Sequence, residues 1–334
     1  MASIPSNIAD LAWAIQSAKG SAVADGSDVF RAYLAGGEQP HGEQVREDFE
    51  ETTGGRMLSD SYVSQASVTG APEFFVMPKS IGSLLYGVLG AKAVSGAGDP
   101  YTHTFTWATT VPYFTFWRML GNGLYEKLTD CIITHLKIHG ESGKPLRVTP
   151  TIMGLTPTYL ASSVAAASVE KTQRFMHYDG AGALKVEGTA VSHIRSFDLD
   201  VDNGAAIVPG DSLTPNDVSI GRLTIEMATT QLVTDFTLWK RLMYASSTPS
   251  GGDPATSTPL ELAGSPAGLA PKWTRVAASR TLEVLIPRVQ VLPFADVPDV
   301  SGNPLVRQVT YRAFAPTDGS TPMTAKVLNS LASY

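Results

Sequence analysis

Residues 59–90 read SDSYVSQASVTGAPEFFVMPKSIGSLLYGVLG, and this stretch joins a strand, a break and a helix. Its first part alternates polar and apolar residues, as a half-buried strand does, and the Gly70–Pro72 segment interrupts it. After Pro78 the apolar residues recur at helical spacing, and Gly90 is a suitable helix end. We expect a helix with one apolar stripe, formed by Ile81, Leu84, Leu85, Val88 and Leu89.

A second stretch repeats this arrangement. Residues 219–230 predict a strand, through Ile220, Leu223, Ile225 and Met227, and residues 235–244 predict a helix with the stripe Phe236, Trp239, Leu242 and Met243. Strand-like segments follow in both cases, so the chain reads as two versions of one unit. We place the boundary in the small-residue segment 161–171, with a first unit at residues 1–165 and a second at 166–334.

The composition indicates a folded protein that buries much of its surface. Of 334 residues, 43% are hydrophobic and only 17% are charged, which excludes a disordered chain and suggests that copies of the chain cover one another. The net charge is −6 and there is no basic block, so specific binding to nucleic acid is not expected. No signal peptide or run of about 20 apolar residues is apparent, which predicts a protein made in a cytoplasm without membrane insertion.

The rest of the chain is strand-rich. Residues 8–19 predict a short helix, residues 29–34 a strand, and the charged segment 36–55 an exposed loop or a loop that reaches a neighbouring subunit. Further strands are expected at residues 102–108, 113–119, 130–139, 146–153, 192–202, 282–291, 306–315 and 323–328. The predicted fold class is mainly β with minor α: two tandem β-sandwich or half-barrel units, each with one flanking helix.

No motif in the sequence predicts catalysis, a cofactor or a metal site. Asp198, Asp200 and Asp202 begin like a calcium loop, but the required glycine and glutamate are absent further on. His135 and His139 are about 13 Å apart in a strand, too far to share a metal. The single cysteine, Cys131, lies in an apolar run and is expected to be a buried core residue. We therefore expect no enzyme activity.

An aromatic cluster leaves two interpretations open. Its residues could stack on sugars, but their alternation with small and polar residues favours packing in a core or a subunit interface. The cluster comprises Tyr101, Phe105, Trp107, Tyr113, Phe114, Phe116 and Trp117.

Several segments resemble one protein family over nearly the whole chain. They are LAWAIQSAKGSA at 11–22, RAYLAGG at 31–37, PKSIGSLLYGVLG at 78–90, YTHTF at 101–105, LKIHGESGKPL at 136–146 and VLNS at 327–330. These patterns are similar to the major tail tube protein of long-tailed, non-contractile phages of the siphovirus type. The tube of a contractile injection system is the nearest competing interpretation.

The resemblance implies a structural virion protein, with two tail-tube-like units, that is assembled in the host cytoplasm. Sheets of neighbouring subunits would close into an inner β-barrel, and stacked rings would form a conduit that DNA passes through without specific binding. Two units per chain favour a homotrimeric ring with pseudo-sixfold symmetry, and a ring of six chains is the alternative. Implied partners are further copies of the chain, the tape measure protein, the tail tip or initiator proteins and the tail terminator protein.

A tube for DNA gives the acidic residues a possible role. Carboxylates on the lumen wall repel phosphates, although at physiological salt this repulsion reaches only about 8 Å. The candidate lumen-facing residues are Asp198, Asp200, Asp202 and Glu226. The alternative function is a phage adhesin or decoration β-sandwich that binds host surface glycans through the aromatic cluster.

Overall fold

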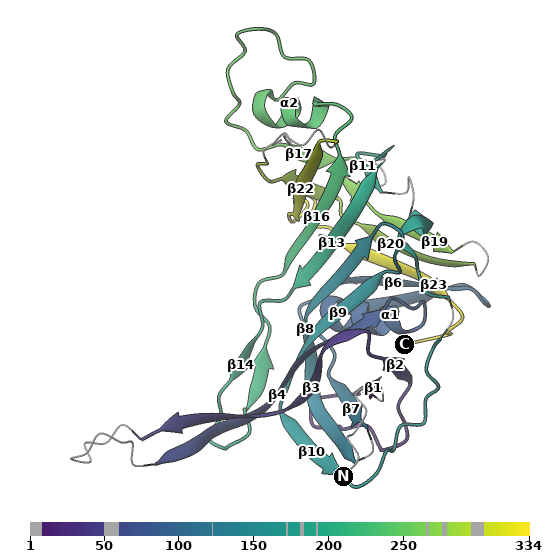
Figure 1. Ribbon diagram of the computed structural model, residues 1–334, viewed down its shortest axis with the longest axis vertical. Helices are drawn as coiled ribbons and strands as arrows, with labels where there is room; N and C mark the ends of the chain where they lie inside the picture. Colours follow the sequence, from purple (N-terminus) through teal and green to yellow (C-terminus); the bar gives the residue numbers. More distant parts are fainter. Residues whose placement is uncertain are drawn as a thin grey trace.

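The computed structural model describes residues 9–49, 60–121, 123–171, 173–180, 184–191, 193–264, 267–275, 279–294 and 304–334. Strand accounts for 52% and helix for 7% of the structure, so the chain is mainly β, as expected. A large sheet forms the body, a smaller sheet lies behind part of it, and helix α1 lies between the two (Figure 1). Neither sheet closes into a barrel over the residues that the structure describes.

The strands of the large sheet come from both halves of the chain. They are β1 (Ala9–Ile15), β2 (Phe30–Tyr33), β3 (Gly36–Asp48), β4 (Ser61–Phe75), β7 (Phe114–Leu120), β8 (Leu124–Glu141), β9 (Arg147–Gly154), β10 (Thr156–Leu160), β13 (Ile194–Asp202), β16 (Thr224–Leu232), β17 (Glu261–Ala263), β21 (Arg288–Val291) and β22 (Val306–Ala313).

The remaining elements are shorter. The smaller sheet contains β5 (Gly90–Ser95), β6 (Tyr101–Trp107), β19 (Lys272–Arg275), β20 (Arg280–Leu285) and β23 (Thr324–Asn329). Outside the two sheets lie β11 (Lys185–Val186), β12 (Thr189–Ala190), β14 (Ala206–Val208), β15 (Asp217–Ser219), β18 (Leu269–Ala270), the 3₁₀ turn His177–Gly180, and helices α1 (Ser80–Leu89) and α2 (Thr237–Tyr244).

Strand β8 organises the large sheet because it pairs with four other strands. Its first half pairs with β7 and β10, and its second half pairs with β9 and β13, always antiparallel. The two halves meet at Asp130, whose φ of 53° lies in the left-handed region that Asp tolerates better than most residues. Through β8 the strands of the N-terminal half continue directly into those of the C-terminal half.

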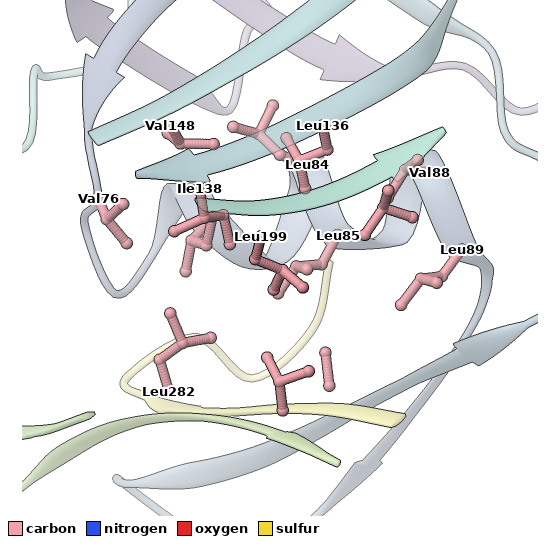
Figure 2. Packing of buried hydrophobic residues seen from close by; sticks show 14 of the residues in the cluster. Val76, Leu84, Leu85, Val88, Leu89, Leu136, Ile138, Val148, Leu199 and Leu282 are labelled. Atoms are coloured by element: carbon pink, nitrogen blue, oxygen red, sulfur yellow. The ribbon is translucent and has the colours of Figure 1, made fainter. Parts of the chain in front are cut away.

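Helix α1 fills the core between the two sheets. Its predicted stripe is confirmed, since Ile81, Leu84, Leu85, Val88 and Leu89 are at most 1% exposed. Figure 2 shows four residues of this stripe, Leu84, Leu85, Val88 and Leu89, among Leu136, Ile138 and Val148 from the large sheet and Leu282 from the small one. Gly90 ends the helix with a φ of 92°, and its N–H donates to the Tyr86 carbonyl.

The helix is buried on more sides than one stripe predicts. Gly82 and Gly87 are also buried, and each lets another residue approach the helix backbone closely. A Cβ atom on Gly87 would lie 2.6 Å from Cδ1 of Ile133, and a Cβ atom on Gly82 would overlap the ring of Tyr334. Because these two positions have no side chain, Tyr334 and Ile133 can pack directly against the helix backbone where an ordinary surface helix would carry polar residues.

A carboxylate from the segment between the two predicted units meets the start of α1. Oε2 of Glu170 accepts a hydrogen bond from the Lys79 N–H at 3.2 Å. Burial raises the pKa of Glu170 to about 7, although this hydrogen bond and the Lys79 charge act in the opposite direction. The positive end of the helix therefore offsets only part of the desolvation of this carboxylate.

The predicted helix over residues 8–19 is wrong. Its residues 9–15 form strand β1, which lies between β2 and β7 and is buried on both faces. Leu11 and Trp13 point into the main core, and Ala12 and Ala14 pack against a second cluster with Trp117. A strand buried on both faces reads as a continuous apolar run, which short helical spacing can imitate.

The segment 36–55, predicted as a loop, begins instead with the strand β3, and its residues 50–55 lie outside the described residues. Strand β3 pairs with β4 over most of its length. Together they form a hairpin that extends well beyond the body of the molecule (Figure 1). We predicted a loop because the segment is rich in charged residues, but the strands of an exposed hairpin can carry charged residues as well.

The second predicted helix is present as α2, but its packing differs from that of α1. Every side chain of α2 remains at least partly exposed, and Phe236 and Met243 of the predicted stripe are 48% and 37% exposed. Figure 1 places α2 at the end of the molecule opposite the β3–β4 hairpin. The apolar periodicity predicted the helix correctly, but it does not indicate whether another part of the chain packs on the apolar face.

Both sheets combine strands from the two predicted units. Strand β13 pairs with β8 in the large sheet, and β23 pairs with β6 in the small one. The division into residues 1–165 and 166–334 therefore does not separate two independent cores, and it stays a prediction about the repeated order of elements.

We expect Gly82→Ala to destabilise the protein by about 1–3 kcal/mol because the new methyl group overlaps the Tyr334 ring. In a Tyr334→Ala background, the same change should be neutral or stabilising by up to about 1 kcal/mol, because alanine favours a helix over glycine. Gly98→Ala is the control, since nothing lies within 4 Å of the position that its new Cβ atom would take. Chemical denaturation measures all four variants, and an equal cost of Gly82→Ala in both backgrounds contradicts this packing.

We expect Glu170→Gln to remove a pH dependence of stability. Because folding raises this pKa from 4.5 to about 7, the folded state retains a proton that the unfolded state loses, and stability falls as the pH rises through this interval. The loss of stability should be about 3 kcal/mol, since each pKa unit corresponds to about 1.4 kcal/mol. Thermal melts from pH 4 to pH 8 measure it; parallel profiles for the wild type and the variant would exclude Glu170 as the source.

Candidate functional site: the polar face of the large sheet

One face of the large sheet is polar over a run of neighbouring strands. The run is β3-β4-β9-β8-β13-β16-β22-β21-β17 in the described part of the chain. Along β8, β9, β13, β16 and β22 buried and solvent-accessible residues alternate, so one face packs on the core and the other remains open. We call the open face of these nine strands the polar face.

The strand register aligns five charged residues and Gln290 in a row across the polar face. Each residue of the row lies directly opposite the next one on the neighbouring strand. The row is Lys137, Asp200, Glu226, Arg312, Gln290 and Glu261, from β8 to β17. Such opposite pairs are close enough to interact directly.

Asp198 and Asp200 lie beside basic residues of β8. Oδ1 of Asp198 is 2.7 Å from Nδ1 of His139 and 3.3 Å from Nζ of Lys137. Oδ1 of Asp200 is 3.2 Å from Nε2 of His135. All of these side chains are about one-third exposed, so solvent screens the pairs and each contributes little to stability.

The other two predicted acidic residues also lie on the polar face. Asp202 accepts a hydrogen bond from the Gly204 N–H at 2.8 Å and so supports the turn after β13. Glu226 forms an ion pair with Arg312 at 2.6 Å. The structure therefore brings all four candidates onto one surface, but as members of a mixed charge pattern rather than a bare acidic wall.

The polar face keeps a negative balance when its histidines are neutral. Its carboxylates outnumber its lysines and arginines: the acidic residues include Glu38, Glu43, Glu73, Glu141, Asp198, Asp200, Asp202, Glu226 and Glu261, and the basic ones include Arg46, Lys137, Arg147, Arg288 and Arg312. Thr149, Thr230 and Thr310 lie between them. Sequence reasoning missed the basic partners. Their alternation along residues 130–139 was visible, but the pairing of β8 with β13 was not.

The two ends of the polar face differ in charge. At one end, β3 carries Glu38 and Glu43 on this face, opposite Ala71 and Ser67 of β4. At the other end, Arg288 of β21 forms an ion pair with Glu261 of β17 at 2.5 Å. This guanidinium holds the pKa of Glu261 below its usual value, and a hydrogen bond from Gln290 acts in the same direction.

The hairpin of β3 and β4 carries exposed apolar residues near its outer end. Phe49 and Tyr62, both 41% exposed, contact each other with their ring centroids 4.9 Å apart, and Val45 is also exposed. The Tyr62 hydroxyl donates to Glu47 at 2.7 Å, which raises the pKa of this tyrosine. Apolar side chains at the end of a projecting hairpin are typical of a contact surface.

The aromatic cluster of the sequence is largely internal. Phe105, Phe114, Phe116 and Trp117 are at most 1% exposed, whereas Trp107 is open to solvent. The four buried rings cannot stack on a sugar. The core interpretation of the cluster therefore fits them.

The described residues show few features of chemical reactivity. Cys131 is fully buried, and burial raises the pKa of its thiol far above neutrality. Among the residues that the structure describes, no three His, Cys, Asp or Glu side chains gather in a way that could hold a metal ion. None of the described helices is long and apolar enough to cross a membrane.

Comparison with known proteins assigns this chain to a family. No curated protein matches the sequence. A family model described as phage tail tube protein matches residues 6–308, which is most of the chain. The match includes the strands of the polar face, helix α1 and the β3–β4 hairpin, apart from the last residues of β22. The chain belongs to the phage tail tube protein family.

Proposed function

We propose that copies of this chain assemble into rings, and that stacked rings form the tail tube through which DNA leaves a long-tailed, non-contractile phage. The family membership supports a structural role in the virion tail. The observation that carries the proposal is the large open sheet, whose one face is polar and whose end strands β3 and β17 each have a free edge within the described part of the chain. An edge strand leaves backbone N–H and C=O groups unpaired, and closing a ring would pair these groups with strands of neighbouring copies.

We infer that the polar face lines the lumen. The opposite face of the same strands packs on the core, so only the polar face can line a channel built from this sheet. Its net negative charge repels phosphates, while the histidine, lysine and arginine partners of its carboxylates limit that repulsion. Asp198, Asp200, Asp202 and Glu226 are the lumen residues in this proposal.

Two repeated units per chain favour a ring of three chains with pseudo-sixfold symmetry, and a ring of six chains is the alternative. The β3–β4 hairpin, with Phe49 and Tyr62 near its end, is suited to contact a neighbouring copy in the stack. Assembly in the host cytoplasm would involve the tape measure, the initiator proteins at the tail tip and the tail terminator. The role is structural, without catalysis.

We expect purified chain at high concentration to form rings and tubes in negative-stain electron micrographs. Averages viewed down the tube axis should show six similar densities around a hollow centre, contributed by three chains. The molar mass of isolated rings distinguishes three chains from six. Discrete compact particles at every concentration, together with binding to host glycans, would favour the adhesin alternative.

We expect tubes of Asp198→Lys/Asp200→Lys to retain DNA that wild-type tubes release. The new lysines lie next to Lys137 and His139, and together they create a basic strip that binds phosphates with strong salt dependence. Co-sedimentation with short DNA fragments at two salt concentrations measures retention. The matched control is Asp253→Lys/Asp318→Lys, which makes the same charge change in exposed loops outside the polar face. Equal DNA binding by both double variants would place the polar face outside the lumen.

A further inference from the structure

Trp107 remains outside the core, although four rings of the aromatic cluster are buried. It ends strand β6 and is 45% exposed, whereas Phe105 of the same strand is fully buried. A single exposed ring is common on protein surfaces, so the surroundings of Trp107 decide whether it belongs to a binding site.

Trp107 lines a pocket with a volume of about 640 Å³, which we call the Trp107 pocket. The other walls come from the second half of the chain. They are the start of β16 with Leu223, and the segment that follows β22 with Phe314 and Pro316. The volume lies within the range of about 300–1,000 Å³ that is typical of small-molecule sites.

Hydrogen bonds hold the aromatic walls of the Trp107 pocket in place. The Trp107 N–H donates to Oγ1 of Thr321 at 3.3 Å, and this hydroxyl donates to the carbonyl of the fully buried Met323 at 2.9 Å. The Phe314 N–H donates to the Arg288 carbonyl at 3.0 Å. The two rings are therefore positioned before a ligand arrives, which lowers the entropy cost of binding.

The Trp107 pocket offers a positive charge and unpaired donors. Of the described residues that line it, only Arg222 is charged. The Arg222 guanidinium and the Trp107 indole N–H make no hydrogen bond or ion pair with any residue that the structure describes. Asp318, the acidic residue in the loop after β22, already accepts a hydrogen bond from the Ser320 N–H at 3.0 Å. A free guanidinium is a preferred partner of carboxylate, phosphate and sulfonate groups, so the pocket suits an anion.

The uncharged walls favour an aromatic ligand over a sugar. No Asp, Glu, Asn or Gln side chain is among the described residues that line the pocket, so the hydroxyl groups of a sugar would find few side-chain acceptors there. Trp107 and Phe314 instead offer flat apolar surfaces, to which an aromatic ring binds by stacking or edge-to-face contact. The ligand that fits both features is a flat ring with one negative group.

The Trp107 pocket lies on the side of the large sheet opposite the polar face. Ile225 of β16 and Ala313 of β22 line the pocket and belong to the packing of the core. Their neighbours Glu226 and Arg312 form an ion pair on the polar face. In the proposed tube the pocket would therefore lie outside the lumen, and its ligand would be separate from the DNA that passes through.

We propose that the Trp107 pocket binds a small planar aromatic anion, whose ring stacks on Trp107 and whose negative group pairs with Arg222. This inference goes beyond the proposed tube function and does not depend on it. The site belongs to the single chain, because both halves of that chain supply its walls.

Two matched probes test the site on the unassembled full-length chain. Anilinonaphthalene sulfonate is a planar aromatic anion, and phenylnaphthylamine is its neutral counterpart without the sulfonate. We expect Arg222→Gln to weaken binding of the anionic probe about tenfold and of the neutral probe less than about twofold, because only the anionic probe carries a charge. Fluorescence titrations measure the dissociation constants, and thermal melts verify that each variant is folded.

The aromatic wall is tested with the same probes. Trp107→Ala should weaken both probes about tenfold, and Trp107→Phe should restore most of the affinity, because it keeps a flat ring at this position. The matched control is Lys240→Gln on helix α2, which removes a cation near the exposed residues Phe236 and Met243. This control should leave the affinity for both probes unchanged.

The outcomes separate this inference from the proposed function. Equal effects of Arg222→Gln on the two probes overturn the anion site, and so does a loss of anionic-probe binding with Lys240→Gln instead of Arg222→Gln. The absence of saturable binding of either probe overturns the pocket as a ligand site. None of these results bears on tube formation, and a chain that binds the anionic probe but forms no tubes contradicts only the proposed function.

Discussion

The two-residue alternation along β8 and β13 is the constraint on which the rest of the structure depends. One side of this strand pair carries Leu136, Ile138 and Leu199, which pack with helix α1, and the other side carries the charged row. A shift of one residue in register would exchange the two faces and place carboxylates against the helix. The buried helix therefore fixes the register, and the register in turn aligns the basic residues of β8 with the acidic residues of β13.

Local patterns in the sequence predicted the elements better than their surroundings. Helix α1 was predictable to within a residue because its stripe, its proline-containing start and Gly90 all agree. The exposed packing of α2 could not be predicted, because periodicity identifies an apolar face and not its partner. Strand β1 was mistaken for a helix because burial on both faces removes the alternation that marks a strand.

In the candidate site, too, the sequence predicted the strand and its exposed face but not the residues that pair with it. Asp198, Asp200 and Asp202 were recognised as one face of a strand from their spacing alone. Their partners on β8 and the pairing of Glu226 with Arg312 depend on strand neighbours far apart in the chain, which only the fold reveals. The change from a bare acidic row to a mixed one matters physically. Carboxylates paired with bases attract fewer cations and repel phosphates less strongly, so the lumen proposed above would repel DNA only weakly.

The repeated order of strands also bears on why the chain would form a closed ring rather than an irregular polymer. The first half of the chain contributes the group β3-β4-β9-β8 to the large sheet, the second half contributes the group β13-β16-β22-β21, and the two groups meet where β8 pairs with β13. A contact between copies that repeated this junction would rotate each group relative to the last by the same amount. Equal rotations close a ring when their sum reaches a full turn. Since two groups belong to one chain, every second junction of such a ring would already be formed by folding. Strand β17, with only three residues, ends the large sheet beside β21, and so short an edge strand offers wrong partners few backbone groups to pair with.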